Sequence, residues 1–332
     1  MKPTLLSLRR AVGVVGVAAM FSVGVGCSSE PPGGHRSTGL KYALHGDTAY
    51  RMGQYGVAAQ RYRLALMRLR AADDQDAVAQ SLHNYGMSLK AGGECRSAIV
   101  ALAESAELHR KLEKPARRAL NLLAIGECQF ALRRTGDATA SLGEAITWAK
   151  KGKDYATAAR ATAGIGAARA LSGRLDQAAK RYADAEKLAK KSGDAGAQAL
   201  VANNRGRLLV RRGDHASAVK LFLKAADGFR KSRDPDGLAS ALANAAAAKQ
   251  SLKAPPFDVA MLHQRAGHAA TAARRYHLAA SSFAAAARHF DAAGKTDLAT
   301  NCRNAGRQVL DALQHQRTTG TAAAATPGNG TN

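Results

Sequence analysis

Residues 165–189, IGAARALSGRLDQAAKRYADAEKLA, and residues 204–226, NRGRLLVRRGDHASAVKLFLKAA, share one pattern at a spacing of 40 residues. In each, a glycine is followed by an alanine after 12 residues, a large residue after four more, and a small residue after three more. A fixed period in this range predicts a solenoid, in which each repeat stacks on its neighbours. Five repeats fill the four slots in register, with Gly46, Gly86, Gly126, Gly166 and Gly206; Ala58, Ala98, Ala138, Ala178 and Ala218; Tyr62, Leu102, Leu142, Tyr182 and Phe222; and Ala65, Ser105, Ala145, Ala185 and Ala225.

Within one period, spacings of three and four residues place the recurring residues on one face of an α-helix. Two helical runs are separated by a turn, which carries Gly53, Gly93, Gly173 or Gly213 because glycine tolerates the left-handed conformation after a helix end. In the third repeat Arg133 occupies this slot, and we expect the turn glycine to be displaced to Gly136. Between repeats, polar turns with Asp, Gly or Pro predict helix stops and new N-caps. Each repeat is therefore predicted to be two antiparallel helices.

The order Gly, Ala, aromatic or Leu, then Ala resembles the tetratricopeptide repeat, most clearly over residues 40–250. The long unit and its Leu82-His83-Asn84-Tyr85-Gly86 core resemble the kinesin-light-chain type of this repeat. We call the residues at the four recurring positions the ladder. HEAT and armadillo arrays have a similar period but do not require these residue types. The resemblance implies an all-α fold, a right-handed superhelix of about six helical hairpins plus a capping helix, with partners bound in its concave groove.

The regular ladder over residues 40–237 is followed by a region, 238–316, that we expect to hold degenerate repeats and a cap. Pro255 and Pro256 break a helix there, and the ladder resumes at Gly267, Ala279 and Phe283, which is 21 residues after Ala246 instead of 40. Helices are expected to start near 238, 257, 276 and 297, and which of them act as first helices is left open. Residues 317–332 lack apolar periodicity and are expected to form a disordered tail.

The N-terminus resembles a bacterial lipoprotein leader. Lys2, Arg9 and Arg10 precede a 16-residue uncharged run, which is short for a membrane span, and the segment 25–29 reads VGCSS. We expect residues 1–26 to be a signal peptide, Cys27 to carry lipid, and 27–39 to be a flexible tether. Ser28 in place of Asp implies the outer membrane of the bacterial envelope, facing the periplasm. Because Gly24 stands where the motif prefers a large aliphatic residue, an uncleaved anchor and an ordinary signal peptide remain alternatives.

The net charge of +24 implies attraction to anionic partners, such as lipid headgroups, lipopolysaccharide or acidic proteins. A basic ridge is predicted at the ends of the second helices; its cations either offset helix dipoles or bind a ligand. The ridge consists of Arg70, Arg110, Lys150, Lys190 and Arg230, again 40 apart. Nucleic acid is a weak candidate, because aromatic residues make up only 5% of the chain and no nucleic-acid-binding signature is present.

No catalytic motif, phosphate-binding loop or zinc-ligand spacing occurs, so we expect a non-enzymatic protein without cofactor or metal. Antiparallel packing brings Cys95 and Cys128 toward the same end of adjacent helices, where they are either bridged or buried as small hydrophobic residues.

The first helices are predicted to line the groove. By resemblance, Asn84, Asn204 and Asn244 are candidates to hold a peptide backbone, with Lys90, Arg207 and Arg211 on the same strip to meet acidic groups. The alternative is that these asparagines bond across adjacent helices. The sequence therefore predicts an envelope-tethered scaffold that binds protein or peptide partners. The alternative function is a cationic solenoid that binds an anionic surface or polymer.

Overall fold

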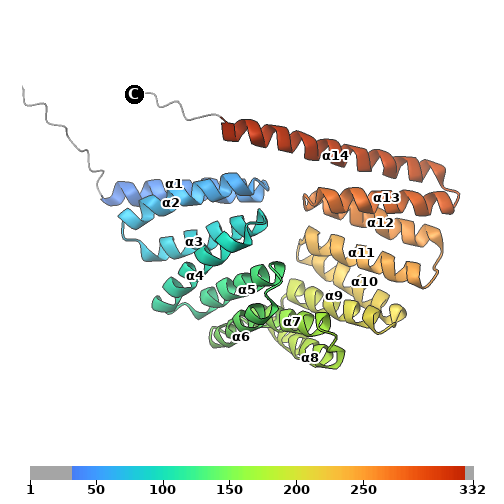
Figure 1. Ribbon diagram of the computed structural model, residues 1–332, viewed down its shortest axis with the longest axis horizontal. Helices are drawn as coiled ribbons and strands as arrows, with labels where there is room; N and C mark the ends of the chain where they lie inside the picture. Colours follow the sequence, from blue (N-terminus) through green and yellow to red (C-terminus); the bar gives the residue numbers. More distant parts are fainter. Residues whose placement is uncertain (1–31, 326–332) are drawn as a thin grey trace, which may run out of the picture.

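The computed structural model describes residues 32–325, with side chains over 34–315. This part of the chain forms fourteen α-helices and no strand, stacked along an arc (Figure 1). The helices are α1 (Pro32–Arg51), α2 (Tyr55–Ala71), α3 (Gln75–Ala91), α4 (Cys95–Lys111), α5 (Pro115–Ala131), α6 (Thr135–Lys151), α7 (Tyr155–Leu171), α8 (Leu175–Ser192), α9 (Ala195–Arg211), α10 (His215–Lys231), α11 (Pro235–Ser251), α12 (Pro256–Ala272), α13 (Tyr276–Ala292) and α14 (Thr296–Ala325). The prediction of an all-α solenoid of antiparallel helices is confirmed.

Many of the turns between helices contain one residue in the left-handed conformation. Gly53, Gly93, Gly173 and Gly213 adopt it, as expected for glycine after a helix end. The expected displacement in the third repeat is wrong, because Arg133 itself has φ of 60° and Gly136 lies inside α6. The turn requires the left-handed conformation at a fixed distance from the helix end. A non-glycine residue at this position therefore adopts it, at a conformational free-energy cost of roughly 1 kcal/mol.

Five of the turns end in an aspartate that caps the next helix. The Asp214 carboxylate, for example, accepts a hydrogen bond from the Ser217 backbone N–H at 3.0 Å, which satisfies one of the free donors at the start of α10. This bond lowers the pKa of Asp214. The N-caps predicted between repeats are therefore present at Asp74, Asp154, Asp194 and Asp234, whereas the turn before α5 has no side-chain cap and Asp214 caps a second helix within a repeat.

The ladder residues form notches between paired helices. A Cβ atom on Gly206 of α9 would lie 2.6 Å from the Phe222 ring of α10, and one on Gly86 would lie 2.6 Å from Leu102. Phe222 is only 1% exposed, and Ala218 and Ala225 beside it are fully buried. A small residue on one helix thus admits a large residue from the next, which explains why both recur at a period of 40.

The irregular spacing after Ala246 has two causes. One turn has an extra residue, and two helices with the position of a first helix, α11 and α12, follow each other. Residues 252–255 form a four-residue turn before α12, whereas most turns have three residues. Gly267 is then the twelfth residue of α12, as Gly206 is of α9, and it receives Phe283 from α13. Helix α12 therefore takes the role of a first helix. In chain order the fourteen described helices make seven hairpins. The contact between a ladder glycine and the large ladder residue occurs in only six of the described helix pairs, and the sixth pair is α12 with α13. Helix α11 lies between the fifth pair, α9 with α10, and this sixth pair.

Two domain boundaries differ from the prediction. The tether over 27–39 is wrong for residues 32–39, because α1 begins at Pro32 and Gly39 packs tightly against Leu69 of α2. The tail predicted from 317 is helical through Ala325, as the alanines of α14 favour a helix even without apolar periodicity. The predicted signal peptide 1–26 and Cys27 lie outside the described residues.

The first helices of consecutive hairpins contact one another, from α1 to α11, and so form the inner side of the arc. At its bend, α5 and α7 lie inside α6 and α8 (Figure 1). The open ends of the arc meet, because the Arg274 guanidinium after α12 donates a hydrogen bond to the Met52 carbonyl after α1. The groove between the first helices is therefore bounded along its length by the helices and at its mouth by this contact.

Candidate functional site

Four of the six predicted groove residues line two adjoining hollows on the concave side. A hollow of about 270 Å³ contains Arg207, Arg211 and Asn244, and a second of about 260 Å³ contains Asn204 together with the same two arginines. The apolar walls come from Val210, Phe222, Ala247 and Ala248 in the first hollow and from Phe130, Ala167, Ala170, Leu171, Tyr182 and Leu208 in the second. Two cations therefore lie between two apolar depressions.

The two arginines differ in their bonding. Arg211 donates a hydrogen bond to the Ala170 carbonyl in the last turn of α7, so its guanidinium is held against the neighbouring first helix. Arg207 is exposed and makes no hydrogen bond or ion pair within residues 34–315. Both arginines lie close enough to Tyr182 to act on its phenol, whose pKa is nevertheless raised because burial dominates. Arg207 is thus the cation that is available to an anionic group.

The groove asparagines are divided between the two predicted roles. The Asn244 side chain donates to the side-chain amide oxygen (Oδ1) of Asn203 at 3.1 Å, and Asn84 donates to Asp47 at 3.2 Å, so both bond across adjacent first helices. Asn204 is half-buried and has no side-chain hydrogen bond within the described chain. Only Asn204 keeps its amide free for a ligand.

The first hollow also holds an unsatisfied polar atom. The Nδ1 atom of His215, which lines the hollow with Arg207, is buried and has no hydrogen-bond partner among the described residues. Because a buried polar group without a partner is costly, such an atom indicates a site where a ligand or water bonds. The sequence analysis missed His215, since its position at the start of α10 belongs to a second helix.

A third hollow, of about 560 Å³, lies at the N-terminal end of the groove. Its floor is a polar cluster in which the Tyr62 hydroxyl donates to Asp47 at 2.5 Å and Asn84 donates to the same oxygen. Burial, and then the Asp47 carboxylate, raise the pKa of Tyr62. The sequence analysis singled out Asn84 here but not Asp47, although Asp47 directly follows the ladder residue Gly46.

Lys90 is separate from these hollows. It forms an ion pair with Glu127 of α5, between neighbouring first helices. Because this carboxylate already neutralises its charge, Lys90 is a weaker candidate for contact with an anionic ligand than Arg207.

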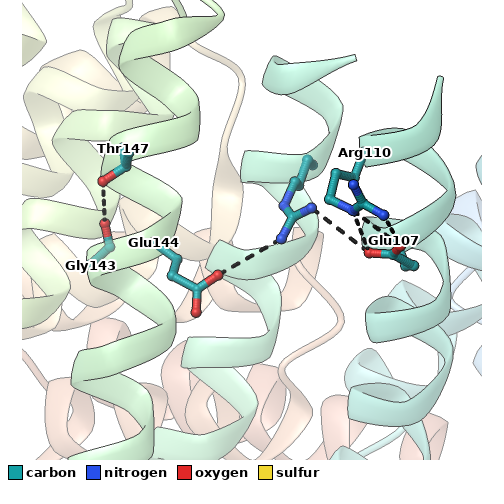
Figure 2. A network of polar contacts seen from close by, with 6 residues as sticks. Glu107, Arg110, Gly143, Glu144 and Thr147 are labelled. Atoms are coloured by element: carbon teal, nitrogen blue, oxygen red, sulfur yellow. Dashed lines mark hydrogen bonds and ion pairs between the residues drawn. The ribbon is translucent and has the colours of Figure 1, made fainter. Parts of the chain in front are cut away.

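The ridge cations lie in the last turns of the second helices, as expected. Arg110, for example, pairs with Glu107 of its own helix at 2.6 Å (Figure 2). The same Glu107 lies 3.9 Å from Arg118, which reaches Glu144 on its other side. Of the five cations, Lys150 alone has no ion pair in the described chain, and the paired ones are Arg70, Arg110, Lys190 and Arg230. The acids nearby offset much of the field of this ridge.

Cys95 and Cys128 are both buried, unbridged and part of one apolar cluster that extends from α2 to α7. Burial raises the pKa of the Cys128 thiol, and a hydrogen bond with Cys95 adds to this shift. Of the two alternatives from the sequence, the structure therefore has the buried, reduced pair.

Within the described residues, no group of three His, Cys, Asp or Glu side chains has the arrangement of a metal site. Among the same helices, none combines the length and hydropathy that a bilayer span requires.

No family model and no curated protein matches this sequence. Solved structures do match its fold. Aspartyl phosphate phosphatase F from Bacillus subtilis is 14% identical, with a TM-score of 0.61 over 82% of this chain and 71% of that chain. The Rap conjugation gene regulator of plasmid pLS20, solved with a Phr peptide, is 14% identical, with a TM-score of 0.59 over 90% and 80%. A signal-transduction ATPase with a tetratricopeptide repeat sensor from Pyrococcus horikoshii is 13% identical, with a TM-score of 0.55 over 80% and 43%. The fold is that of a tetratricopeptide-type solenoid.

Proposed function

We propose that the protein is a non-enzymatic scaffold that binds a segment of a partner protein in its concave groove, at the hollows around Arg207. The observation that carries this proposal is the convergence of an unpaired cation, a free amide on Asn204 and an unpartnered Nδ1 on His215. These groups can bind a carboxylate and a peptide backbone, while the apolar walls accept aliphatic side chains.

The comparison structures agree with this proposal. The Rap regulator with the same fold was solved with a peptide, so a solenoid of this kind can accommodate one. The free Arg207 gives the groove of this chain a preference for a segment with an acidic side chain or a carboxyl terminus.

The alternative function, a cationic solenoid that binds an anionic surface or polymer, is favoured by the net charge of +24. It needs no particular residue, and it predicts binding that weakens steeply with salt. The two functions therefore differ in one expectation. Only groove binding predicts that removing the charge of one groove arginine lowers partner binding more than removing one positive charge elsewhere.

Arg207→Gln is expected to lower partner retention about tenfold or more in affinity capture from the native host, because the bound acidic group loses the cation of these hollows that has no partner among the described residues. Lys150→Gln is the matched control, since it also removes one unpaired positive charge, from the outer ridge. It should leave retention unchanged, and binding by the wild type should persist at about 0.5 M salt. Equal losses in both variants, together with release by salt, would instead establish the cationic-surface function.

We further propose that lipid at Cys27 tethers this scaffold to the bacterial envelope, on the side of the outer membrane that faces the periplasm. The support is the sequence of the leader, with its basic start, short apolar run and VGCSS segment.

Cys27→Ser is expected to abolish incorporation of labelled palmitate and to release the protein from the membrane fraction, because the thiol that carries the lipid is absent. Cys302→Ser serves as the control and should keep both, since this thiol is buried in the solenoid. Label retained by Cys27→Ser would rule out lipid at this residue.

A further inference from the structure

Two hollows lie between successive second helices on the outer side of the described solenoid, one between α8 and α10 and one between α2 and α4, and the latter carries two large, exposed apolar side chains. Between α2 and α4 lies a hollow of about 450 Å³. Met67 and Val100, both in its lining, are 65% and 70% exposed, the largest fractions among the large apolar side chains of the described chain. Exposed apolar side chains gathered in one place indicate an interaction site.

The repeats provide an internal comparison for these two positions. The residues equivalent to Met67 in the following second helices are polar, namely Glu107, Thr147, Lys187 and Asp227. The residues equivalent to Val100 are Gln60, Ala140, Lys180 and Lys220. The outer side farther along therefore presents polar, charged or small residues where this hollow presents Met67 and Val100. Because both side chains are largely exposed, packing within the solenoid does not explain why they are apolar.

The hollow has a buried apolar floor and a charged rim. Leu66 and Leu82, at 5% and 2% exposure, form the floor. On the rim, Arg70 pairs with Glu104 at 2.6 Å, while Arg63 has no hydrogen bond or ion pair within the described residues. Helix α2, which forms one wall, carries four arginines and no acid. The rim is therefore attractive to a negatively charged occupant.

We propose that this outer hollow, lined by Met67, Val100 and Arg63, docks an acidic segment of a partner protein through one large apolar side chain. A second copy of this chain fits less well, because each copy carries a net charge of +24. The apolar run of the leader fits less well too, since the charges that precede it, Lys2, Arg9 and Arg10, are all positive. A concave floor with Glu104 at its rim is suited to an inserted side chain and not to a flat anionic bilayer.

The test uses the full chain in its native host, with a photo-reactive amino acid in place of Ser97, which lines the hollow and leaves Met67 and Val100 intact. The matched control carries the same group in place of Gln177, the equivalent residue of α8. Ser97 variants are expected to cross-link a protein segment that contains Asp or Glu beside a large apolar residue. A synthetic peptide of that segment should bind the purified protein, and its version with Asn and Gln should not.

Met67→Lys combined with Val100→Lys separates apolar docking from charge attraction. This variant reproduces the lysines of the α8–α10 groove, and both positions are exposed, so the fold should be retained. We expect cross-linking from residue 97 to fall about tenfold, as loss of two apolar anchors implies, and to be unaffected by Arg207→Gln in the groove. Cross-links to lipid, to residues 1–31 or to a second copy would overturn the proposal. So would equal yield from position 177, absence of any cross-link, or no loss in the double variant.

Discussion

Gly206→Val is expected to lower the free energy of unfolding by about 2–4 kcal/mol, measured by urea denaturation followed by circular dichroism. The nearest atoms to a new Cβ at this position belong to the Phe222 ring, at 2.6 to 3.0 Å, and this ring is only 1% exposed, so the valine can be accommodated only if the ring shifts. The matched control is Gly143→Val in α6, where nothing lies within 4 Å of a new Cβ. It should stay within about 0.5 kcal/mol of the wild type.

A second substitution tests whether the notch itself is responsible. Phe222→Ala alone should cost about 3–5 kcal/mol, because it leaves a cavity between α9 and α10. When Gly206→Val and Phe222→Ala are combined, the introduced valine side chain fills part of that cavity. The destabilisation of the double variant should therefore be smaller than the sum of the two single effects by more than about 1 kcal/mol. Strictly additive effects would show that the two side chains do not share one space.

Acidification is expected to destabilise the protein between about pH 6.5 and pH 4. His109 is 2% exposed, with Ser105 and Asn121 around its Nδ1 atom. Burial, and then the neighbouring His83, lower the pKa of His109 to about 4. In this window His109 binds a proton in the unfolded chain but not in the folded chain. The free energy of unfolding therefore falls as the pH falls, by roughly 3 kcal/mol from this one residue. Above about pH 6.5 the residue contributes no pH dependence.

The measurement is urea denaturation at a series of pH values, followed by fluorescence of Trp148, the single tryptophan, which lies on α6 near this region. His109→Gln should remove up to about half of the loss between pH 6.5 and 4, since glutamine offers an acceptor but does not titrate, while the remainder comes from other histidines such as His263, whose pKa burial also lowers to about 4. His277→Gln, at an exposed position, should leave the loss unchanged. An unchanged pH dependence in His109→Gln would assign the titration to other groups.

The architecture could be predicted from the sequence because each repeat provides its own comparison. Gly206 and Phe222 recur at fixed spacing for a steric reason, which the periodicity records directly. The change of phase at α12 was visible only as the 21-residue step to Gly267, since one additional turn residue and the exchange of helix roles produce the same irregularity. Turn conformation was predicted where glycine is present but not at Arg133, because the position and not the residue dictates it.

The groove could be predicted less well than the fold. Asn204, Arg207, Arg211 and Asn244 do line adjoining hollows, because a strip on the first helices necessarily faces the inner side. Which of them are free depends on neighbours 41 residues away, such as Asn203 for Asn244 and Ala170 for Arg211, and spacing alone does not reveal these bonds.

The outer hollow was overlooked for a different reason. Met67 and Val100 occupy different positions within the repeat, on successive second helices. A comparison of equivalent positions along the sequence therefore shows each residue separately and does not reveal that they are neighbours. Only the stacking of α2 beside α4, which places both in one depression, brings them together.

The partner is proposed to bind on the inner side of the solenoid, around Arg207. Amide hydrogen exchange of the purified protein, alone and in complex with the partner that it retains, locates the binding surface. We predict that the partner slows exchange in α9 and α11, over 204–211 and 244–251, and leaves α8 and α10 nearly unchanged beyond the first turn of α10 at His215. Protection confined to the outer helices, with α9 and α11 exchanging as in the free protein, would contradict the account.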